Sequence, residues 1–136
     1  MKIFKELMAI KTTERFEIVD ITDKINNIIL NNHIKLGIAN IFSKHSTAAI
    51  IINENDSGLL KDMKNILKNV VSDENSYFHD IIDNNADSHL RAMFLGSSES
   101  IPIENQKLNL GTWQSVFFID LDGPRNRVVG IMIIGE

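Results

Sequence analysis

Three of the four histidines in this sequence stand beside other polar side chains, a placement that is typical of a functional site. His45 precedes Ser46, His79 precedes Asp80, and His89 lies in the next polar stretch. Three neutral imidazoles that leave a fourth position open are a known arrangement around a catalytic metal ion. We therefore predict His45, His79 and His89 as catalytic residues and as ligands of a divalent metal, Zn²⁺ or Mg²⁺.

The spacing of these histidines leaves a second interpretation open. No two of them are four residues apart, so one helix face cannot hold the set and folding has to assemble it. In the second interpretation, the three histidines are unrelated polar residues, and each forms a hydrogen bond with a nearby backbone group. Asp80, beside His79, is predicted as a catalytic carboxylate that orients an imidazole or acts as a general base. Glu54 is set aside, because a strand over 48–52 would separate it from His45 by roughly 25 Å.

Two arginines and the single tryptophan could recognise a phosphorylated ring. Arg125 and Arg127 follow an Asp-Gly-Pro turn, and guanidinium groups bind phosphate through paired hydrogen bonds. Arginines in a turn are also common as solvated surface residues. Trp113 could form a wall for a planar ligand, although a lone tryptophan at a strand start more often packs in the core. The residues predicted to contact substrate or phosphate are Ser46, Thr47, Trp113, Gln114, Arg125 and Arg127.

Two apolar strands and a helix must position the first histidine. The strands are predicted over 35–42 and 48–52, where isoleucines favour a buried pleated surface. A four-residue polar corner with His45 joins them, which predicts a central hairpin. Apolar residues at helical spacing then predict a helix over about 57–71.

A second, shorter helix must position His89. It is predicted to begin near Asn84 or Asn85 and to run through Leu95, with Met93 and Phe94 facing the core. Further strands follow to the end of the chain. The order of strands, helix, strands, two helices and strands predicts one α+β domain with a largely antiparallel sheet and helices on one side.

Length, charge and cysteine content limit the classes of protein to which this chain can belong. The chain has 136 residues, 43% of them apolar, which suits one soluble domain with its own core. A net charge of -4 argues against nucleic acid and membrane surfaces as main partners, since both need a basic surplus. The sequence has no cysteine, which excludes disulfides and thiolate metal sites. No stretch has the pattern of a signal peptide or membrane span, so we expect a cytoplasmic protein.

Short motifs follow one another along almost the whole chain. They are His45-Ser46-Thr47-Ala48, Asn53-Glu54-Asn55, Tyr77-x-His79-Asp80, Ser88-His89, Leu95-Gly96-x-Ser98, Pro102, Leu110-Gly111-Thr112-Trp113-Gln114, Arg127 and Gly135-Glu136. With these motifs, residues 4–136 resemble the YjbQ family, long catalogued as uncharacterised and also labelled secondary thiamine-phosphate synthase. The common His-Thr-Thr or His-Thr-Ser form of the first motif is His-Ser-Thr here, which retains a hydroxyl.

The resemblance implies a fold, an assembly and an activity. It implies one α+β domain over 1–136 whose mixed, largely antiparallel sheet curves as a half-barrel, usually in a homotrimer with sites near the subunit interfaces. It also implies a weak thiamine-phosphate synthase activity, which joins a pyrimidine diphosphate to a thiazole phosphate and releases pyrophosphate. The family's motif positions fall on His45, Glu54, His79, Asp80, His89, Trp113, Gln114 and Arg127.

Three functions are compatible with these residues. The first is an enzyme that acts on a small phosphorylated heterocycle, with Lys44, Arg125 and Arg127 holding phosphate charge and the histidines binding metal or donating protons. The second is a non-enzymatic trimeric module that binds a phosphorylated metabolite or a metal without turnover. The third is a metal-dependent phosphatase that uses the same groups.

Overall fold

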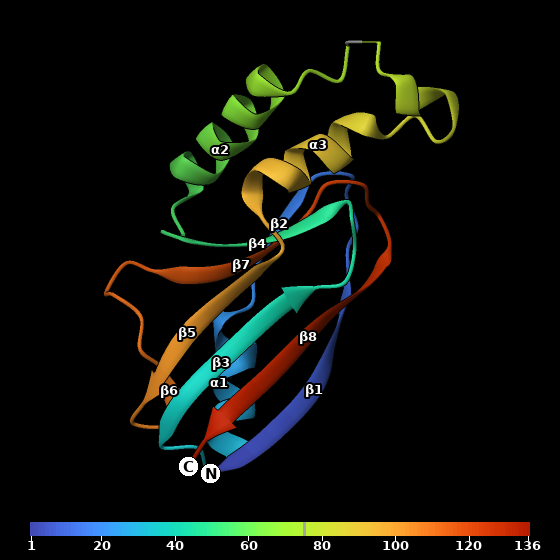
Figure 1. Ribbon diagram of the computed structural model, residues 1–136. Coiled ribbons are helices and arrows are strands. Elements are labelled where there is room, and N and C mark those ends of the chain that lie inside the picture. The colour runs from blue at the N-terminus through green and yellow to red at the C-terminus, as the bar shows by residue number, and fades with distance from the viewer. Residues whose placement is uncertain (75) are drawn as a thin grey trace.

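Two antiparallel sheets pack against each other in the computed structural model, which describes residues 1–74 and 76–136 (Figure 1). Sheet A has the strand order β1-β8-β3-β5-β6, and sheet B has the order β2-β7-β4. The strands are β1 (Lys2–Lys11), β2 (Glu17–Asp20), β3 (Leu36–Ser43), β4 (Ala48–Asn53), β5 (Ser98–Glu104), β6 (Lys107–Leu108), β7 (Ser115–Asp120) and β8 (Asn126–Gly135). The helices are α1 (Thr22–Asn31), α2 (Ser57–Val70) and α3 (Ala86–Leu95), with the short 3-10 helix η1 (Phe78–Ile81) before α3. The predicted α+β fold, with a largely antiparallel sheet curved as a half-barrel, is confirmed.

The main core lies between the two sheets and follows from the alternation of side chains along each strand. In β8, Val129, Ile131 and Ile133 are buried, while the residues between them are more exposed. Ile25 and Ile29 of α1 are fully buried in the same cluster. Burial of each of these side chains stabilises the fold by about 1.5–3 kcal/mol, so this core fixes α1 against the sheets.

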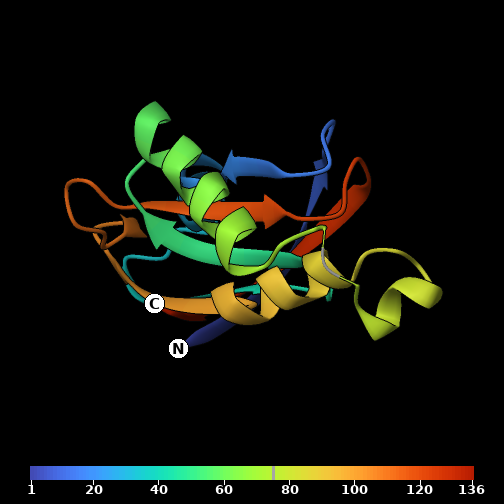
Figure 2. The ribbon, with the colours of Figure 1, turned by 90° about the horizontal axis from the view of Figure 1, so that it is seen from above.

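A second, smaller core covers the other face of sheet B. Ala49 of β4 and Phe117 and Ile119 of β7 form its centre, with Leu60 of α2 packed against them. Figure 2 shows α2 and α3 lying over this sheet. Because β7 is covered on both faces, every residue over 116–120 is buried.

The strands before and after His45 do not form the predicted hairpin. β3 pairs with β5 on one edge and with β8 on the other, so neither edge is free for β4. β4 pairs instead with β7 in sheet B. The predicted hairpin is therefore wrong, and the polar corner at His45 carries the chain from one sheet to the other.

The two predicted helices of the chain's middle are present, but α3 is turned differently from the prediction. The helix predicted over about 57–71 is confirmed as α2. Met93 and Phe94 are 68% and 63% exposed, so their predicted place in the core is wrong. The buried face of α3 carries Asp87 and Arg91, which pair with each other at 3.0 Å between Oδ2 and Nη1. None of the helices in the described residues is long and apolar enough to cross a membrane.

Candidate functional site

His45 lies in the connection between β3 and β4 and is held by the backbone of β8. The N–H of Val128 donates a hydrogen bond to Nε2 of His45 at 2.9 Å. Since Nε2 is the acceptor, the proton of the neutral ring lies on Nδ1. Partial burial lowers the pKa of His45, and the positive charge of Arg127 lowers it further. The ring is therefore a neutral imidazole at neutral pH, with one nitrogen fixed by the fold and the other able to donate.

The buried ion pair between Arg127 and Asp120 lies next to this imidazole in the structure. Nε of Arg127 is 3.0 Å from Oδ2 of Asp120, and Nη2 is 2.7 Å from Oδ1. The side chains are only 5% and 0% exposed. Nη2 of Arg127 also donates to the hydroxyl of Thr47 at 3.0 Å. These bonds tie the start of β8 to the residues just after His45, so Arg127 and Thr47 are positioning groups rather than open ligand contacts.

Thr12 and Asp120 complete this network, and the sequence interpretation missed both residues. The hydroxyl of Thr12 donates to Oδ2 of Asp120 at 2.6 Å and accepts from the backbone N–H of Arg125 at 2.9 Å. Burial alone would raise the pKa of Asp120, but the hydrogen bonds from Arg127 and Thr12 outweigh it and lower that pKa. The one available signal was a carboxylate within the apolar run of β7, because a buried charge requires a partner.

The other two histidines meet each other at the start of α3. The rings of His79 and His89 are in edge-to-face contact, with their centroids 4.7 Å apart. Nε2 of His79 lies 4.0 Å from Oδ2 of Asp83, which is too long for a hydrogen bond. Nε2 of His79 is buried and has no hydrogen-bond partner among the described residues. The two histidines therefore lie together as a pair, and their catalytic role stays a prediction.

Asp80 stabilises the N-terminus of α3 through a hydrogen bond to the backbone. Its Oδ1 accepts a hydrogen bond from the backbone N–H of Ala86 at 3.0 Å, and Ala86 is the first residue of α3. A carboxylate at a helix N-terminus satisfies a free donor and complements the helix dipole. Asp80 therefore fixes the helix that carries His89, while its predicted catalytic role stays a prediction.

Asp122 links the α3 end of the site to the connection between β7 and β8. Its Oδ2 accepts from Nδ2 of Asn85 at 2.8 Å and from Nη2 of Arg125 at 3.2 Å. Arg15 adds a second link, because its Nη2 is 3.0 Å from Oδ1 of Asp87 and its Nε is 3.9 Å from Asp122. Arg125 itself is half exposed, which leaves part of its guanidinium group open to a ligand.

The predicted metal ligands do not gather within one chain. Among the described residues, no three histidine, aspartate or glutamate side chains are grouped closely enough to hold a metal ion. His79 and His89 are in contact, whereas His45 is bonded to Val128. The three-histidine metal site stays a prediction that needs further ligands or a second copy of the chain.

Trp113 and Gln114 lie at the opposite end of β7 from the His45 network. In the register of β4 and β7, Ala48 faces Asp120 at one end and Asn53 faces Ser115 at the other. Six residues of strand span about 20 Å, so the β6–β7 connection cannot reach His45 in the same chain. Trp113 is 72% exposed, and Oε1 of Gln114 accepts from the N–H of Gly111 at 2.9 Å. Ser46 and Glu54 are also exposed, at opposite ends of β4.

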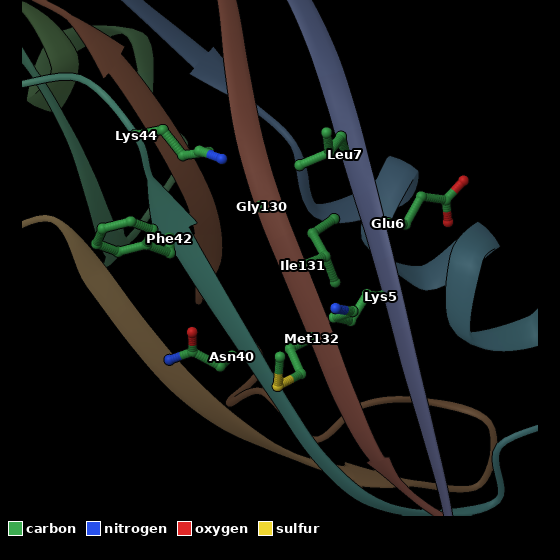
Figure 3. A pocket seen from close by; sticks show the side chains of 9 residues that line it. All are labelled: Lys5, Glu6, Leu7, Asn40, Phe42, Lys44, Gly130, Ile131 and Met132. Carbon is green, nitrogen blue, oxygen red and sulfur yellow. The ribbon is translucent and has the colours of Figure 1, made fainter.

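The outer face of sheet A contains an open, largely apolar hollow beside the His45 corner. It has a volume of about 500 Å³ and lies across β1, β8 and β3. Leu7, Phe42 and Met132 are 65%, 45% and 42% exposed around it, and Lys44 reaches over it from the end of β3 (Figure 3). Exposed apolar side chains gathered on one sheet face are typical of an interaction surface.

Comparison of the sequence with protein families gives one consistent match. Residues 6–136 match the family described as "UPF0047 protein YjbQ-like". A UPF0047 protein of Methanothermobacter thermautotrophicus is 46% identical over 136 residues, which are 100% of this chain and 95% of the relative. The UPF0047 protein YugU of Bacillus subtilis is 37% identical over 94% of this chain and 97% of its own.

Comparison with solved structures gives the same fold. A YbjQ-like protein of unknown function from Sulfolobus solfataricus superposes with a TM-score of 0.95, at 42% identity over 99% of each chain. A YjbQ/UPF0047 family protein from Clostridium acetobutylicum superposes with a TM-score of 0.90, at 36% identity over 95% of this chain and 99% of its own. The family resemblance inferred from the motifs is thereby confirmed.

Proposed function

Since this chain belongs to the YjbQ-like UPF0047 family, we propose that it is an enzyme of the secondary thiamine-phosphate synthase type. It would join a pyrimidine diphosphate to a thiazole phosphate. In that reaction the bond between the pyrimidine-bearing carbon and a diphosphate oxygen breaks, and its electron pair leaves with pyrophosphate. The same carbon forms a new bond to the thiazole. The protein's task is to hold two phosphorylated rings and to stabilise the charge of the leaving group.

The observation that carries this proposal is the fixed, neutral imidazole of His45. The Val128 N–H occupies Nε2, so Nδ1–H is the donor available to a pyrophosphate oxygen. No described residue forms a hydrogen bond with Nδ1 in the structure. Arg127 acts on this reaction through His45, because it positions the corner and lowers the pKa of the ring. The half-exposed Arg125 and the exposed Lys44 would supply the phosphate contacts.

The proposed reaction includes no step at a metal ion held by the protein. The described residues do not bring a third ligand to His79 and His89, so the donors present in one chain do not fit a catalytic metal centre. His79 and His89 would instead contact the substrate through ring atoms other than the buried Nε2 of His79. A divalent cation bound to the diphosphate could still neutralise its charge.

The same proposal includes a homotrimer in which neighbouring chains complete the site. Two observations support it: sheet A has an uncovered apolar face, and the predicted residues divide between opposite ends of β7. Rotation about a three-fold axis would cover that face and could bring Trp113 of one chain toward His45 of another. Analytical ultracentrifugation should then give a mass near three times 15.4 kDa. A monomer at all concentrations would contradict this part of the proposal.

The enzymatic part is tested by measuring thiamine phosphate formation with the purified wild type and three variants. His45→Gln keeps an acceptor for the Val128 N–H, but its amide N–H cannot occupy the position of Nδ1–H, so turnover should fall by about 10²–10³-fold. His89→Ala should also reduce turnover. His33→Asn is the matched control, because His33 is exposed and outside the network, and its rate should equal that of the wild type.

Two other results would favour the alternative functions. Calorimetric binding of the two phosphates at fixed stoichiometry without any product would support a binding module. Release of phosphate from a model ester, dependent on added metal, would support a phosphatase. An equal rate of thiamine phosphate formation in wild type and His45→Gln would remove His45 from the reaction.

A further inference from the structure

A short segment before α3 presents large apolar side chains to solvent. This arm comprises residues 77–83 and contains η1. Phe78, Ile81 and Ile82 are 97%, 88% and 75% exposed, whereas large apolar side chains gain free energy when they are removed from water. Figures 1 and 2 show η1 beyond the N-terminal end of α3, away from both sheets. The arm therefore projects from the fold with an apolar surface that the described residues leave uncovered.

The hollow on the outer face of sheet A can receive side chains of this kind. Gly130 of β8 lies between Leu7 of β1 and Phe42 of β3, with which it is paired across the sheet. Among the described residues, a Cβ on Gly130 would have only the backbone oxygen of Phe42 within 4 Å, at 3.8 Å, so the space above the glycine is open. A hollow of about 500 Å³ with apolar walls has room for the ring of a phenylalanine.

The charge around the hollow is positive. Lys5 and Lys44 border it, and Figure 3 shows Lys44 extending over β8. Neither lysine forms an ion pair with a carboxylate of the described residues. Glu6 is the one carboxylate among the described residues that border the hollow. Its side chain lies on the opposite side of β1 from Leu7, where it lines a separate pocket with Ile28 of α1.

The arm carries the opposite charge. It contains Asp80 and Asp83 and has no lysine or arginine. Neither carboxylate forms an ion pair with a lysine or arginine of the described residues. Arg15 lines a pocket with Asp80, but its guanidinium group pairs with Asp87 and lies 3.9 Å from Asp122. Arm and hollow are therefore complementary in charge as well as in apolar character, which favours contact between them over contact between two arms or two hollows.

We propose that the arm of one chain docks in the sheet A hollow of a second copy, with Phe78 above Gly130 and the two arm aspartates near the lysines. The contact is head-to-tail, because arm and hollow are different surfaces of the same chain. A head-to-tail contact closes into a ring when the rotation between copies permits it. The number of copies rests on the proposed function, whose homotrimer three such contacts would close.

The same contact would complete the site across two chains. Lys44 at the hollow adjoins His45 in sequence, and Phe78 in the arm adjoins His79. A docked arm would therefore bring His79, together with His89 in contact with it, toward His45 of the neighbouring chain. The histidines that one chain keeps apart would then meet at the subunit interface.

Sedimentation of the purified full-length chain tests the arm and the hollow separately. The arm variant, Phe78→Ser combined with Ile81→Ser, should lower the assembled mass from three times 15.4 kDa to 15.4 kDa. The hollow variant, Gly130→Leu, fills the open space above the glycine and should have the same effect. The matched control, Ile66→Ser combined with Val70→Ser, removes apolar side chains that are 57% and 58% exposed on α2, and it should remain a trimer.

A mixture of the two variants makes the test independent of folding defects. The arm variant keeps an intact hollow, and the hollow variant keeps an intact arm. The mixture should therefore form one arm–hollow contact per pair, so its mass should rise to twice 15.4 kDa and no further as the concentration increases. Such a pair can form only if both variants are folded.

The proposal is overturned by a wild type that is monomeric at all concentrations, by an arm variant that assembles as the wild type does, or by a mixture that stays monomeric. A control variant that dissociates as fully as the arm variant would overturn it as well. A trimer that survives the arm substitutions would leave the proposed homotrimer and reaction standing. Thiamine phosphate formation is measured separately, so the contact and the reaction can fail independently.

Discussion

Replacement of Arg127 by methionine should destabilise the protein strongly and in a way that depends on pH. Among the residues that the structure describes, the substitution leaves the buried carboxylate of Asp120 with only the Thr12 hydroxyl and one backbone N–H as partners. Loss of one member of a buried ion pair costs about 3–5 kcal/mol. For a chain of this length, that free energy corresponds to a melting temperature lower by about 10–20 °C. Chemical denaturation monitored by circular dichroism measures the change in unfolding free energy.

The pH dependence separates charge from packing in this variant. In the wild type, the pKa of Asp120 is lowered, so its contribution to stability is complete above the pKa of an unfolded aspartate, about 3.9, and is lost as pH falls below it. In Arg127→Met, burial would raise the same pKa, so protonation would relieve the penalty as pH falls. The difference in unfolding free energy between the two proteins should therefore narrow between pH 7 and pH 5.

Arg125→Met provides the matched control. Its ion pair with Asp122 is at the surface, where the Arg125 side chain is 56% exposed, so its removal should cost under about 1 kcal/mol. If Arg127→Met cost no more than Arg125→Met, the buried pair would not stabilise this end of the fold. A destabilisation independent of pH would assign the effect to packing alone.

Three further outcomes are expected. The pKa of His45, followed by proton magnetic resonance, should lie below about 6.5 and should rise in Arg127→Met. In the wild type, the free energy of unfolding should decline as pH falls below about 6.5, because the unfolded histidine binds a proton more readily than the folded one. His45→Gln should remove that decline. Gly123→Ala should cost about 1–3 kcal/mol in denaturation experiments, because a Cβ there would clash with the backbone carbonyl oxygen of Glu14 and crowd Thr12 and Asp120, whereas Gly130→Ala should cost less. Asp80→Ala should cost about 1 kcal/mol because the first backbone N–H of α3 loses its acceptor, and an unchanged stability would contradict that role of the carboxylate.

Local patterns in the sequence were sufficient to identify helices, strands and candidate site residues. The periodicity of 57–71 predicted α2, and apolar runs rich in isoleucine predicted β3 and β4. Polar residues at strand ends pointed to His45, and its motif to the family. These successes depend on spacing within one segment, which the sequence displays directly.

Contacts between distant segments could not be predicted in the same way. His45 and Val128 are 83 residues apart, and Thr12 and Asp120 are 108 apart. The hairpin prediction failed because the choice between sheets depends on which strand edges β5, β7 and β8 already occupy. The orientation of α3 was missed because Asp87 and Arg91 are polar in sequence yet neutralise each other when buried.

The state of the His45 ring provides the most direct test of the proposed reaction. Long-range ¹H–¹⁵N correlation spectra at neutral pH report which ring nitrogen carries the proton. We predict a neutral ring protonated at Nδ1, with that nitrogen shifting when the pyrimidine diphosphate is added. A ring protonated at Nε2 would contradict the role of His45 as the donor to the leaving pyrophosphate. An Nδ1 chemical shift that does not change when the substrate is added would contradict it as well.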